Sequence, residues 1–115
     1  MSSDLRTLAS LGNRLAGCAE IGGRSYADGC ATSPVAYLEG WYVDPDVRRA
    51  GVGAALGRTA VAWARRHSFT ELASDALLDN VLSQRAHEAI GFEDVERSVK
   101  YRTDLGSETD ASHDV

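Results

Sequence analysis

Residues 48–53 read Arg-Arg-Ala-Gly-Val-Gly, and this segment constrains the chain more than any other. It lies between a run typical of a β-strand, Tyr37 to Val43, and a run typical of a helix, Ala54 to His67. Glycines at such a junction lack Cβ atoms and let backbone N–H groups turn toward one point. The start of the helix adds unpaired N–H donors and the positive end of its dipole. The segment therefore predicts a site for phosphate or pyrophosphate.

The spacing separates this loop from two better known nucleotide motifs. It is Arg-x-x-Gly-x-Gly, whereas dinucleotide folds use Gly-x-Gly-x-x-Gly and a P-loop ends in Gly-Lys-Ser/Thr. Taken alone, a glycine-rich loop after a strand is equally consistent with an ordinary turn. The segments that flank the loop are needed to choose between an anion site and a turn.

Periodicity predicts the elements around the loop. In Val35 to Val43, alternation places Val35, Tyr37, Glu39, Trp41 and Val43 on one face, and both faces are mostly apolar, as in a central strand. Gly40 within that strand predicts a bulge or a close backbone approach. The helix that follows has an apolar stripe formed by Val52, Leu56, Ala60 and Trp63.

Further elements flank this unit. Residues 15–25 and 70–74 are expected to be strands, and a second helix is capped by Asp79 or Asn80 and ends at Gly91. Phe92 to Arg102 alternates and predicts a final strand. The order β-β-α-β-α-β predicts an α/β (α+β) fold with a mixed, mostly antiparallel sheet flanked by helices.

Composition excludes several classes of protein. With 115 residues the chain is one domain, and its net charge of −5 does not suggest nucleic-acid binding. No run approaches the roughly 20 apolar residues of a membrane span, and no secretory leader is evident, so we expect a cytoplasmic protein. Cys18 and Cys30 lack metal-ligand spacing and are expected to be free thiols.

Four polar residues are candidates for chemistry. Glu39 among aromatic neighbours would lose hydration, which suits a general base, although an edge glutamate paired with an arginine is equally consistent. Asp75 follows a strand, where ligands gather, but a turn or cap role fits as well. Taken alone, Asn80 is more simply a helix cap and His87 a packed or surface histidine.

These parts, in this order, resemble the Gcn5-related N-acetyltransferase (GNAT) family. Three phrases are similar to those of aminoglycoside 6′-N-acetyltransferases: residues 33–40 (Ser-Pro-Val-Ala-Tyr-Leu-Glu-Gly), 73–75 (Ala-Ser-Asp) and 80–84 (Asn-Val-Leu-Ser-Gln) followed by Gly91-Phe92-Glu93. The resemblance covers residues 18 to 103. It implies an acetyl-CoA-binding core at 16–103, after an irregular or replaced N-terminus at 1–15. Residues 104–115 contain four acidic residues and no Lys or Arg, so we expect an acidic, disordered tail.

The resemblance implies acetyl-CoA as the cofactor and no metal. The pyrophosphate would bind the glycine loop, and the pantetheine arm would pair with the strand beside Gly40. The cofactor-binding residues implied are Trp41, Tyr42, Val43, Arg48, Arg49, Ala50, Gly51, Val52, Gly53, Asn80 and Ser83.

For the acceptor, the resemblance implies direct transfer of acetyl to a primary amine, such as the 6′-amine of an aminoglycoside. Glu39 matches the general base, and His87 stands where many relatives place a tyrosine that protonates the thiolate, with Tyr101 as a weaker candidate. Backbone N–H groups near Trp41 would stabilise the oxyanion. Asp28, Glu39 and Asp75 would supply negative charge for a polycationic substrate.

The chain departs from the family at its N-terminus, where relatives begin with a strand, two helices and another strand. These two helices wall the acceptor site, so we expect a member with this portion missing or reduced. A catalytically weak or inactive acyl-CoA-binding module is therefore the alternative, and a fragment that folds only with a partner chain is a third. The missing portion would leave a sheet edge with unpaired backbone groups, and relatives in this family often dimerise. We therefore expect a homodimer.

Overall fold

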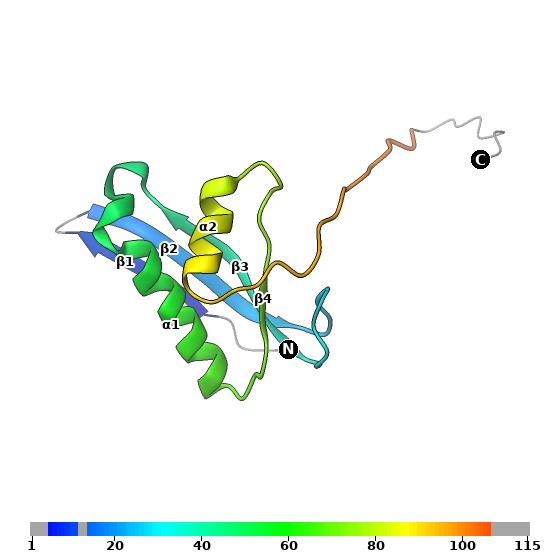
Figure 1. The fold of residues 1–115 in the computed structure, drawn as a ribbon, viewed down its shortest axis with the longest axis horizontal. Coiled ribbons are helices and arrows are strands. Elements are labelled where there is room, and N and C mark those ends of the chain that lie inside the picture. Colours follow the sequence, from blue (N-terminus) through cyan, green and yellow to red (C-terminus); the bar gives the residue numbers. More distant parts are fainter. Residues whose placement is uncertain (1–4, 12–13, 107–115) are drawn as a thin grey trace.

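The computed structural model describes residues 5–11 and 14–106, which form one mixed sheet with helices packed on it (Figure 1). The elements, in chain order, are β1 (Leu5–Leu11), β2 (Arg14–Arg24), β3 (Val35–Val43), the 3-10 helix η1 (Pro45–Ala50), α1 (Val52–Arg66), β4 (Leu72–Ser74) and α2 (Val81–Ala89).

The sheet has the strand order β1-β2-β3-β4. The β1–β2 and β2–β3 pairs are antiparallel, and β4 pairs parallel to β3 with Ala36 opposite Leu72 and Leu38 opposite Ser74. The parallel pair needs a long crossover, which η1 and α1 provide. The predicted fold class, a mixed and mostly antiparallel sheet with flanking helices, is confirmed.

A β-bulge at Glu39 changes which residues share a face of the sheet. Glu20 pairs with Gly40 and Ile21 pairs with Leu38, so Glu39 is an extra residue in β3. Leu38 is buried in the core under α1, and beyond the bulge Trp41 packs against the same core. The expectation that Trp41 and Val43 share a face with Tyr37 is therefore wrong, because one extra residue reverses the alternation.

The core lies between the sheet and α1. The predicted apolar stripe is confirmed, since Val52, Leu56, Ala60 and Trp63 are at most 8% exposed. In Figure 1, α1 and α2 both lie on this face of the sheet. On the opposite face a small cluster of Ala27, Val35 and Tyr37 is buried, and no helix of the described residues covers it.

Both ends of the described chain differ from expectation. Residues 5–11, within the segment expected to be irregular, form β1, because pairing with β2 outweighs the helical spacing of the leucines. The predicted strand Phe92 to Arg102 is wrong: this segment leaves the body as an extended chain (Figure 1, orange). A strand needs a backbone partner, and the side chains of Val99 and Tyr101 are 70% and 91% exposed. The tail expected at 104–115 lies, from residue 107, outside the described residues.

Two smaller expectations can be compared with the described residues. Cys18 and Cys30 are both free and half-buried, as expected. No helix in the described ranges is long and apolar enough to cross a membrane.

Candidate active site

The glycine loop presents an uncapped helix start. Gly51 has φ 82°, in the left-handed region, where it ends η1 and begins α1. The first helical hydrogen bond runs from the Ala55 N–H to the Gly51 carbonyl at 3.1 Å, so the N–H groups of residues 52–54 precede the helical pattern. The cap residue makes no side-chain hydrogen bond, and the first turn contains no acidic residue. This arrangement suits an anion.

Arg48 lies beside this helix start. It is exposed, and its Nε donates to the Val43 carbonyl at 3.2 Å, which holds the guanidinium at the junction of β3 and η1. Arg49 and Ala50 complete η1 by their backbone, and their side chains lie outside the described part of the chain.

The end of β3 is tied to the first turn of α1. The indole Nε1 of Trp41 donates to the Gly53 carbonyl at 3.0 Å, and a Cβ added to Gly53 would lie 3.4 Å from Cγ2 of Val43. Tyr42 is half exposed, and a hydrogen bond to Asp44 raises the pKa of its phenol. A methyl group at position 53 would make ordinary contact with Val43, and its absence leaves that space open where the helix begins.

One edge of β3 is unpaired in this region. β4 pairs only with residues 36–38 of β3, so the strands separate after Leu38 and Ser74. The edge of β3 from Glu39 to Val43 that faces β4 has no strand partner among the described residues. An extended ligand arm with amide groups can hydrogen-bond to such an edge.

His87 and Ser74 form a hydrogen-bonded pair where the strands separate. Nδ1 of His87 lies 2.7 Å from the Ser83 carbonyl, which can only accept, so Nδ1 carries a proton. The Ser74 hydroxyl donates to the Leu38 carbonyl at 3.2 Å, so its oxygen can accept from Nε2 of His87, which lies 2.8 Å away. Edge-to-face contacts with Trp41 and Phe92, at centroid distances of 5.0 and 5.1 Å, fix the ring. The pair can move a proton between the imidazole and the open edge of β3.

Asn80 caps α2, as predicted. Its Oδ1 accepts from the Ser83 N–H at 3.1 Å, while Ser83 itself is half-buried with its hydroxyl 3.5 Å from Nδ1 of His87. The cap thereby fixes the first turn of α2, so that the Ser83 carbonyl can accept the hydrogen bond from the His87 ring. The Asn80 amide nitrogen is not used by this hydrogen bond.

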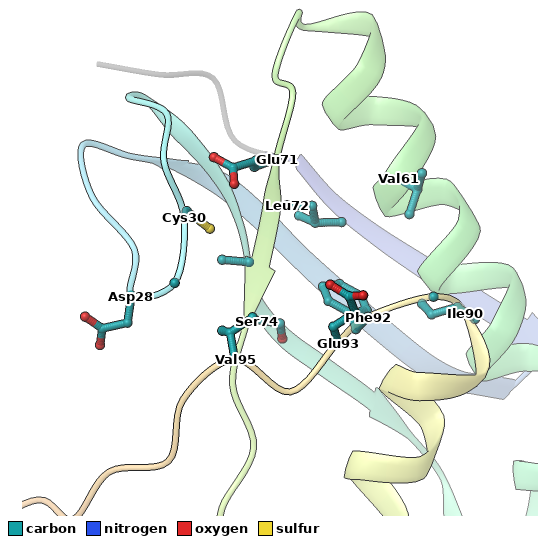
Figure 2. A pocket seen from close by; sticks show the side chains of 13 residues that line it. Asp28, Cys30, Val61, Glu71, Leu72, Ser74, Ile90, Phe92, Glu93 and Val95 are labelled. Carbon is teal, nitrogen blue, oxygen red and sulfur yellow. The ribbon is translucent and has the colours of Figure 1, made fainter.

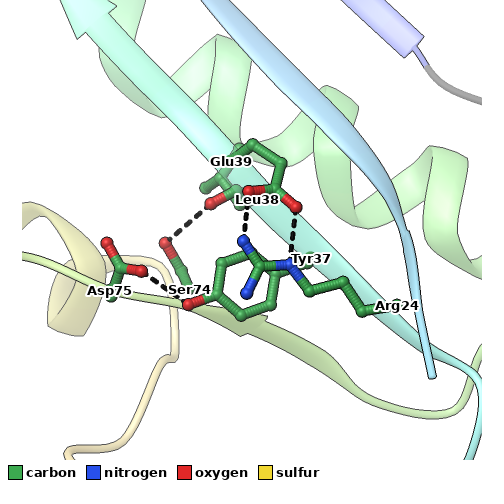
Figure 3. Close-up of polar contacts among 6 residues, drawn as sticks. All are labelled: Arg24, Tyr37, Leu38, Glu39, Ser74 and Asp75. Carbon is green, nitrogen blue, oxygen red and sulfur yellow. Dashed lines mark hydrogen bonds and ion pairs between the residues drawn. The ribbon is translucent and has the colours of Figure 1, made fainter. Parts of the chain in front are cut away.

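Glu39 lies on the uncovered face in an ion pair with Arg24 (Figure 3). Arg24 donates from Nε and Nη2 to the two carboxylate oxygens at 2.7 and 2.5 Å. The Glu39 side chain is 40% exposed, so the expected half-dried environment is wrong and the arginine-paired alternative holds. The bulge explains this, because it moves Trp41 to the other face.

Tyr37 and Asp75 extend this pair into a network. The Tyr37 hydroxyl donates to Asp75 Oδ2 at 2.6 Å, and the Arg24 guanidinium carbon lies 3.5 Å from the Tyr37 ring centroid. Burial, together with the hydrogen bond to Asp75, raises the pKa of Tyr37 to about 12. The hydrogen bond to Glu39 raises the pKa of Arg24 above its ordinary value. Two of the three predicted acceptor carboxylates are thus joined.

The structure does not bring the remaining predicted residues to this network. Asp28 is exposed and accepts from the Tyr26 hydroxyl at 2.8 Å, in a loop that lines a separate pocket of about 310 Å³ along β4 (Figure 2). Tyr101 is 91% exposed in the extended C-terminal segment. No group of His, Cys, Asp and Glu in the described residues could hold a metal ion.

Two residues were missed by the sequence reasoning. Ser74 lies within the segment 73–75 that resembles the family, but no function was predicted for it. Only the structure shows that its hydroxyl contacts His87. Arg24 follows Gly22 and Gly23 in β2, and its position opposite Val35 brings it diagonally to Tyr37. The contact between Arg24 and Glu39 could not be predicted, because it depends on the pairing of β2 with β3 and on the bulge at Glu39.

The chain is similar to a known protein family and to curated proteins. The family model described as "Acetyltransferase (GNAT) family" matches residues 2–92. An aminoglycoside N(6′)-acetyltransferase type 1 of Klebsiella aerogenes is 48% identical over 89 residues, which cover 77% of this chain and 59% of that protein. One from Acinetobacter haemolyticus is 50% identical over 76 residues, covering 66% and 52%. The chain spans little more than half the length of these curated relatives.

Solved structures show the same likeness. The apo aminoglycoside 6′-N-acetyltransferase AAC(6′)-IG from Acinetobacter haemolyticus superposes with a TM-score of 0.80 at 41% identity, covering 90% of this chain and 72% of that one. AAC(6′)-Iy, in complex with the bisubstrate analog CoA-S-monomethyl-acetylneamine, gives 0.81 at 35% identity, covering 88% and 69%.

Proposed function

The chain belongs to the GNAT acetyltransferase family, and from this premise we propose that it acts in acetyl-CoA-dependent N-acetylation of a primary amine, the 6′-amine of an aminoglycoside. The observation that carries the proposal is the uncapped start of α1, with Gly51 at φ 82°, beside the unpaired edge of β3. A relative with 35% identity has been solved with a bisubstrate analog of CoA and an aminoglycoside.

Acetyl-CoA binds, in this proposal, across the starts of α1 and α2. The N–H groups of residues 52–54 hold the pyrophosphate, with Arg48 adding positive charge. The pantetheine arm pairs with the open edge of β3 at residues 41–43. The Asn80 amide and the Ser83 hydroxyl contact the same arm from α2. The thioester then lies where β3 and β4 separate, near Ser74.

The transfer itself is direct. An ammonium group must lose a proton before it can attack, and Glu39 takes this proton, directly or through water. The amine nitrogen bonds to the acetyl carbonyl carbon, and a backbone N–H near Trp41 stabilises the oxyanion. The C–S bond then breaks as the nitrogen gives its second proton to water, and the CoA thiolate receives a proton from Nε2 of the imidazolium form of His87, relayed by the Ser74 hydroxyl. Tyr101 is the second candidate for this acid.

The acceptor is held by negative charge on the uncovered face. Glu39 and Asp75 are joined through Arg24 and Tyr37, and each carboxylate suits an ammonium group of an amino sugar. Asp28, on the neighbouring loop, adds a more distant negative charge.

A non-catalytic acyl-CoA-binding module is the alternative, and one observation favours it. The Glu39 carboxylate is engaged at both oxygens by Arg24, so it is not positioned to take a proton as it stands. Such a module would keep the cofactor site and lose turnover.

We also propose a cytoplasmic homodimer. The two thiols remain free, which fits a reducing compartment where acetyl-CoA is available. The extended C-terminal segment exposes Val95, Val99, Tyr101 and Leu105 by 61% to 91%, and a second copy can cover these apolar side chains.

The test measures release of CoA with a thiol reagent, using acetyl-CoA with kanamycin or tobramycin. The proposal expects turnover by the wild type and a loss of about 10²-fold or more in kcat for Glu39→Gln, because a general base contributes on that order. Glu88→Gln, on an exposed part of α2, is the matched control and keeps full activity. Full activity in Glu39→Gln would remove Glu39 as the base. Calorimetric binding of acetyl-CoA without turnover on any amine would instead support the binding module.

A further inference from the structure

The Arg24 guanidinium lies in a cation site that the protein builds from three other side chains. The Tyr37 ring lies under it, with the guanidinium carbon 3.5 Å from the ring centroid, and the Glu39 carboxylate binds its edge at 2.7 and 2.5 Å. Asp75 fixes the Tyr37 hydroxyl at 2.6 Å and adds a second negative charge. Figure 3 shows the four side chains converging on one face of the sheet.

The chemistry of this site is not specific for arginine. An aromatic face and a carboxylate attract ammonium as well as guanidinium groups, the first through the ring quadrupole and the second through charge-assisted hydrogen bonds. The Tyr37 hydroxyl is held by Asp75 at 2.6 Å, so the ring stays in place as a platform when Arg24 leaves it. The site therefore exists independently of its present occupant.

The occupant is positioned to exchange. Arg24 is the last residue of β2, and its side chain is 44% exposed, as the Glu39 side chain is 40% exposed. Ion pairs at this exposure contribute little to stability, so the side chain can leave without unfolding the sheet. A ligand cation that binds over the Tyr37 ring and at the same edge of the Glu39 carboxylate must displace Arg24, because the guanidinium occupies that position.

We propose that Arg24 is an internal competitor that occupies the subsite for the acceptor's ammonium group. It rests on the proposed function, because it takes the acceptor amine as the competing cation. Acceptors with several positive charges displace Arg24 best, since further ammonium groups gain from the remaining carboxylates. While Arg24 is in place, Glu39 is kept from other cations. Arg24 is thus a specificity-determining residue for the acceptor.

The experiment compares two variants of equal charge. Arg24→Gln empties the subsite, and Arg97→Gln removes an exposed arginine paired with Asp94 at 2.8 Å. Both lose one positive charge, so the general attraction for cations changes equally. Calorimetry with tobramycin is expected to show about tenfold tighter binding to Arg24→Gln than to Arg97→Gln, because the competitor has gone. Equal or weaker binding by Arg24→Gln would overturn the proposal.

A second probe does not depend on the acetyltransferase function. Guanidinium ion, at low millimolar concentrations, is titrated into both variants while the resonances of the Tyr37 ring are followed by NMR. It is expected to shift these resonances in Arg24→Gln and not in Arg97→Gln, and to weaken tobramycin binding only in Arg24→Gln. If the two variants respond alike, the site is not a cation subsite.

The two probes separate the possible failures. Absence of tobramycin binding to the wild type and both variants would reject an aminoglycoside acceptor, while the guanidinium titration would still decide the role of Arg24. Thermal unfolding first establishes that Arg24→Gln folds. If it does not, Arg24→Lys keeps the charge and loses the two-pronged contact with Glu39. It is then compared with Arg97→Lys and is expected to bind tobramycin more tightly, while equal binding would overturn the proposal.

Discussion

At the scale of single residues, the two glycines of the loop have different physical roles. Gly51 has φ 82° and nothing within 4 Å of the position of a Cβ, so the backbone, not space, requires glycine. Gly53 is the second residue of α1 and its φ lies outside the left-handed region, and a Cβ there would meet Cγ2 of Val43 at 3.4 Å, which is normal contact. Sequence reasoning treated both as parts of one turn; only the dihedral angle separates them.

This difference gives a prediction. Gly51→Ala is expected to lower the free energy of unfolding by about 1 kcal/mol, the cost of a Cβ in the left-handed region. Gly53→Ala keeps its stability but binds acetyl-CoA about tenfold more weakly, because its methyl group occupies the space beside the N–H donors. Urea unfolding and calorimetry measure the two quantities. Equal effects of both substitutions on both quantities would contradict the assignment.

At the scale of elements, α2 depends on its cap. A helix of nine residues is too short to be stable on local interactions, and none of its residues is buried. The Asn80 side chain satisfies the Ser83 N–H and thereby holds the His87 ring in place. Sequence reasoning found this cap from the residue type, but its second role in binding the cofactor remains a proposal.

Two substitutions at Asn80 separate these roles. Asn80→Ala is expected to cost about 1 kcal/mol of stability, because the cap is lost. Asn80→Asp keeps an acceptor at the cap and keeps the stability, but it loses the amide donor and binds acetyl-CoA more weakly. Urea unfolding and calorimetry again give the two numbers. An Asn80→Asp variant with wild-type affinity would show that the side chain is a cap and nothing more.

The loop between β2 and β3 is held to β4 by Glu71. Its carboxylate accepts from the Ala31 N–H at 3.0 Å and from both the N–H and the hydroxyl of Thr32, at 2.8 and 2.5 Å. These hydrogen bonds, with those of Thr32 first, lower the pKa of the Glu71 carboxyl. The loop carries Asp28, so Glu71 positions this candidate acceptor residue.

The lowered pKa fixes the direction of a pH effect. A carboxyl that is more acidic in the folded state stabilises the fold above its unfolded pKa of 4.5, and this contribution is lost as the pH falls through the lower folded pKa. Glu71→Gln should therefore lower the Tm at pH 7, and the difference from wild type should shrink progressively below pH 4.5. Glu88→Gln, at an exposed position of α2, controls for the loss of charge. A difference that is constant with pH would contradict the model.

At this scale, features set by the local sequence could be predicted, and features set by pairing with a distant strand could not. The apolar stripe of α1 and the presence of the strand before it could be predicted from the local periodicity of apolar residues, and both are confirmed. The side-chain faces of β3 beyond Leu38 could not be predicted, because a single bulged residue depends on pairing with a distant strand. The strand expected at 92–102 failed for the same reason: alternation shows what could pair, not that a partner is present.

At the scale of the whole molecule, the fold leaves apolar side chains exposed along the C-terminal segment. The C-terminal segment extends from the body with Val95, Val99 and Leu105 each at least 61% exposed (Figure 1). Isolated exposed apolar residues are ordinary, but a row of them on one extended segment marks a contact surface. The proposed homodimer covers this row.

Sedimentation equilibrium tests the dimer. The wild type is expected to associate, and Val99→Asp is expected to shift it to monomer, because a carboxylate in an apolar contact is costly. Val81→Asp is the control: Val81 is 49% exposed at the start of α2, where a negative charge is tolerated. A monomeric wild type, or equal association by both variants, would argue against this surface.

The central claim is that the start of α1 binds the pyrophosphate of acetyl-CoA beside the open edge of β3. The most direct measurement is an NMR titration of the ¹⁵N-labelled protein with CoA, following each backbone amide. The account predicts that the largest shifts fall on the amides of Val52, Gly53 and Ala54, with smaller shifts along Trp41 to Val43. Shifts confined to other parts of the chain, or no shifts at saturating CoA, would contradict it.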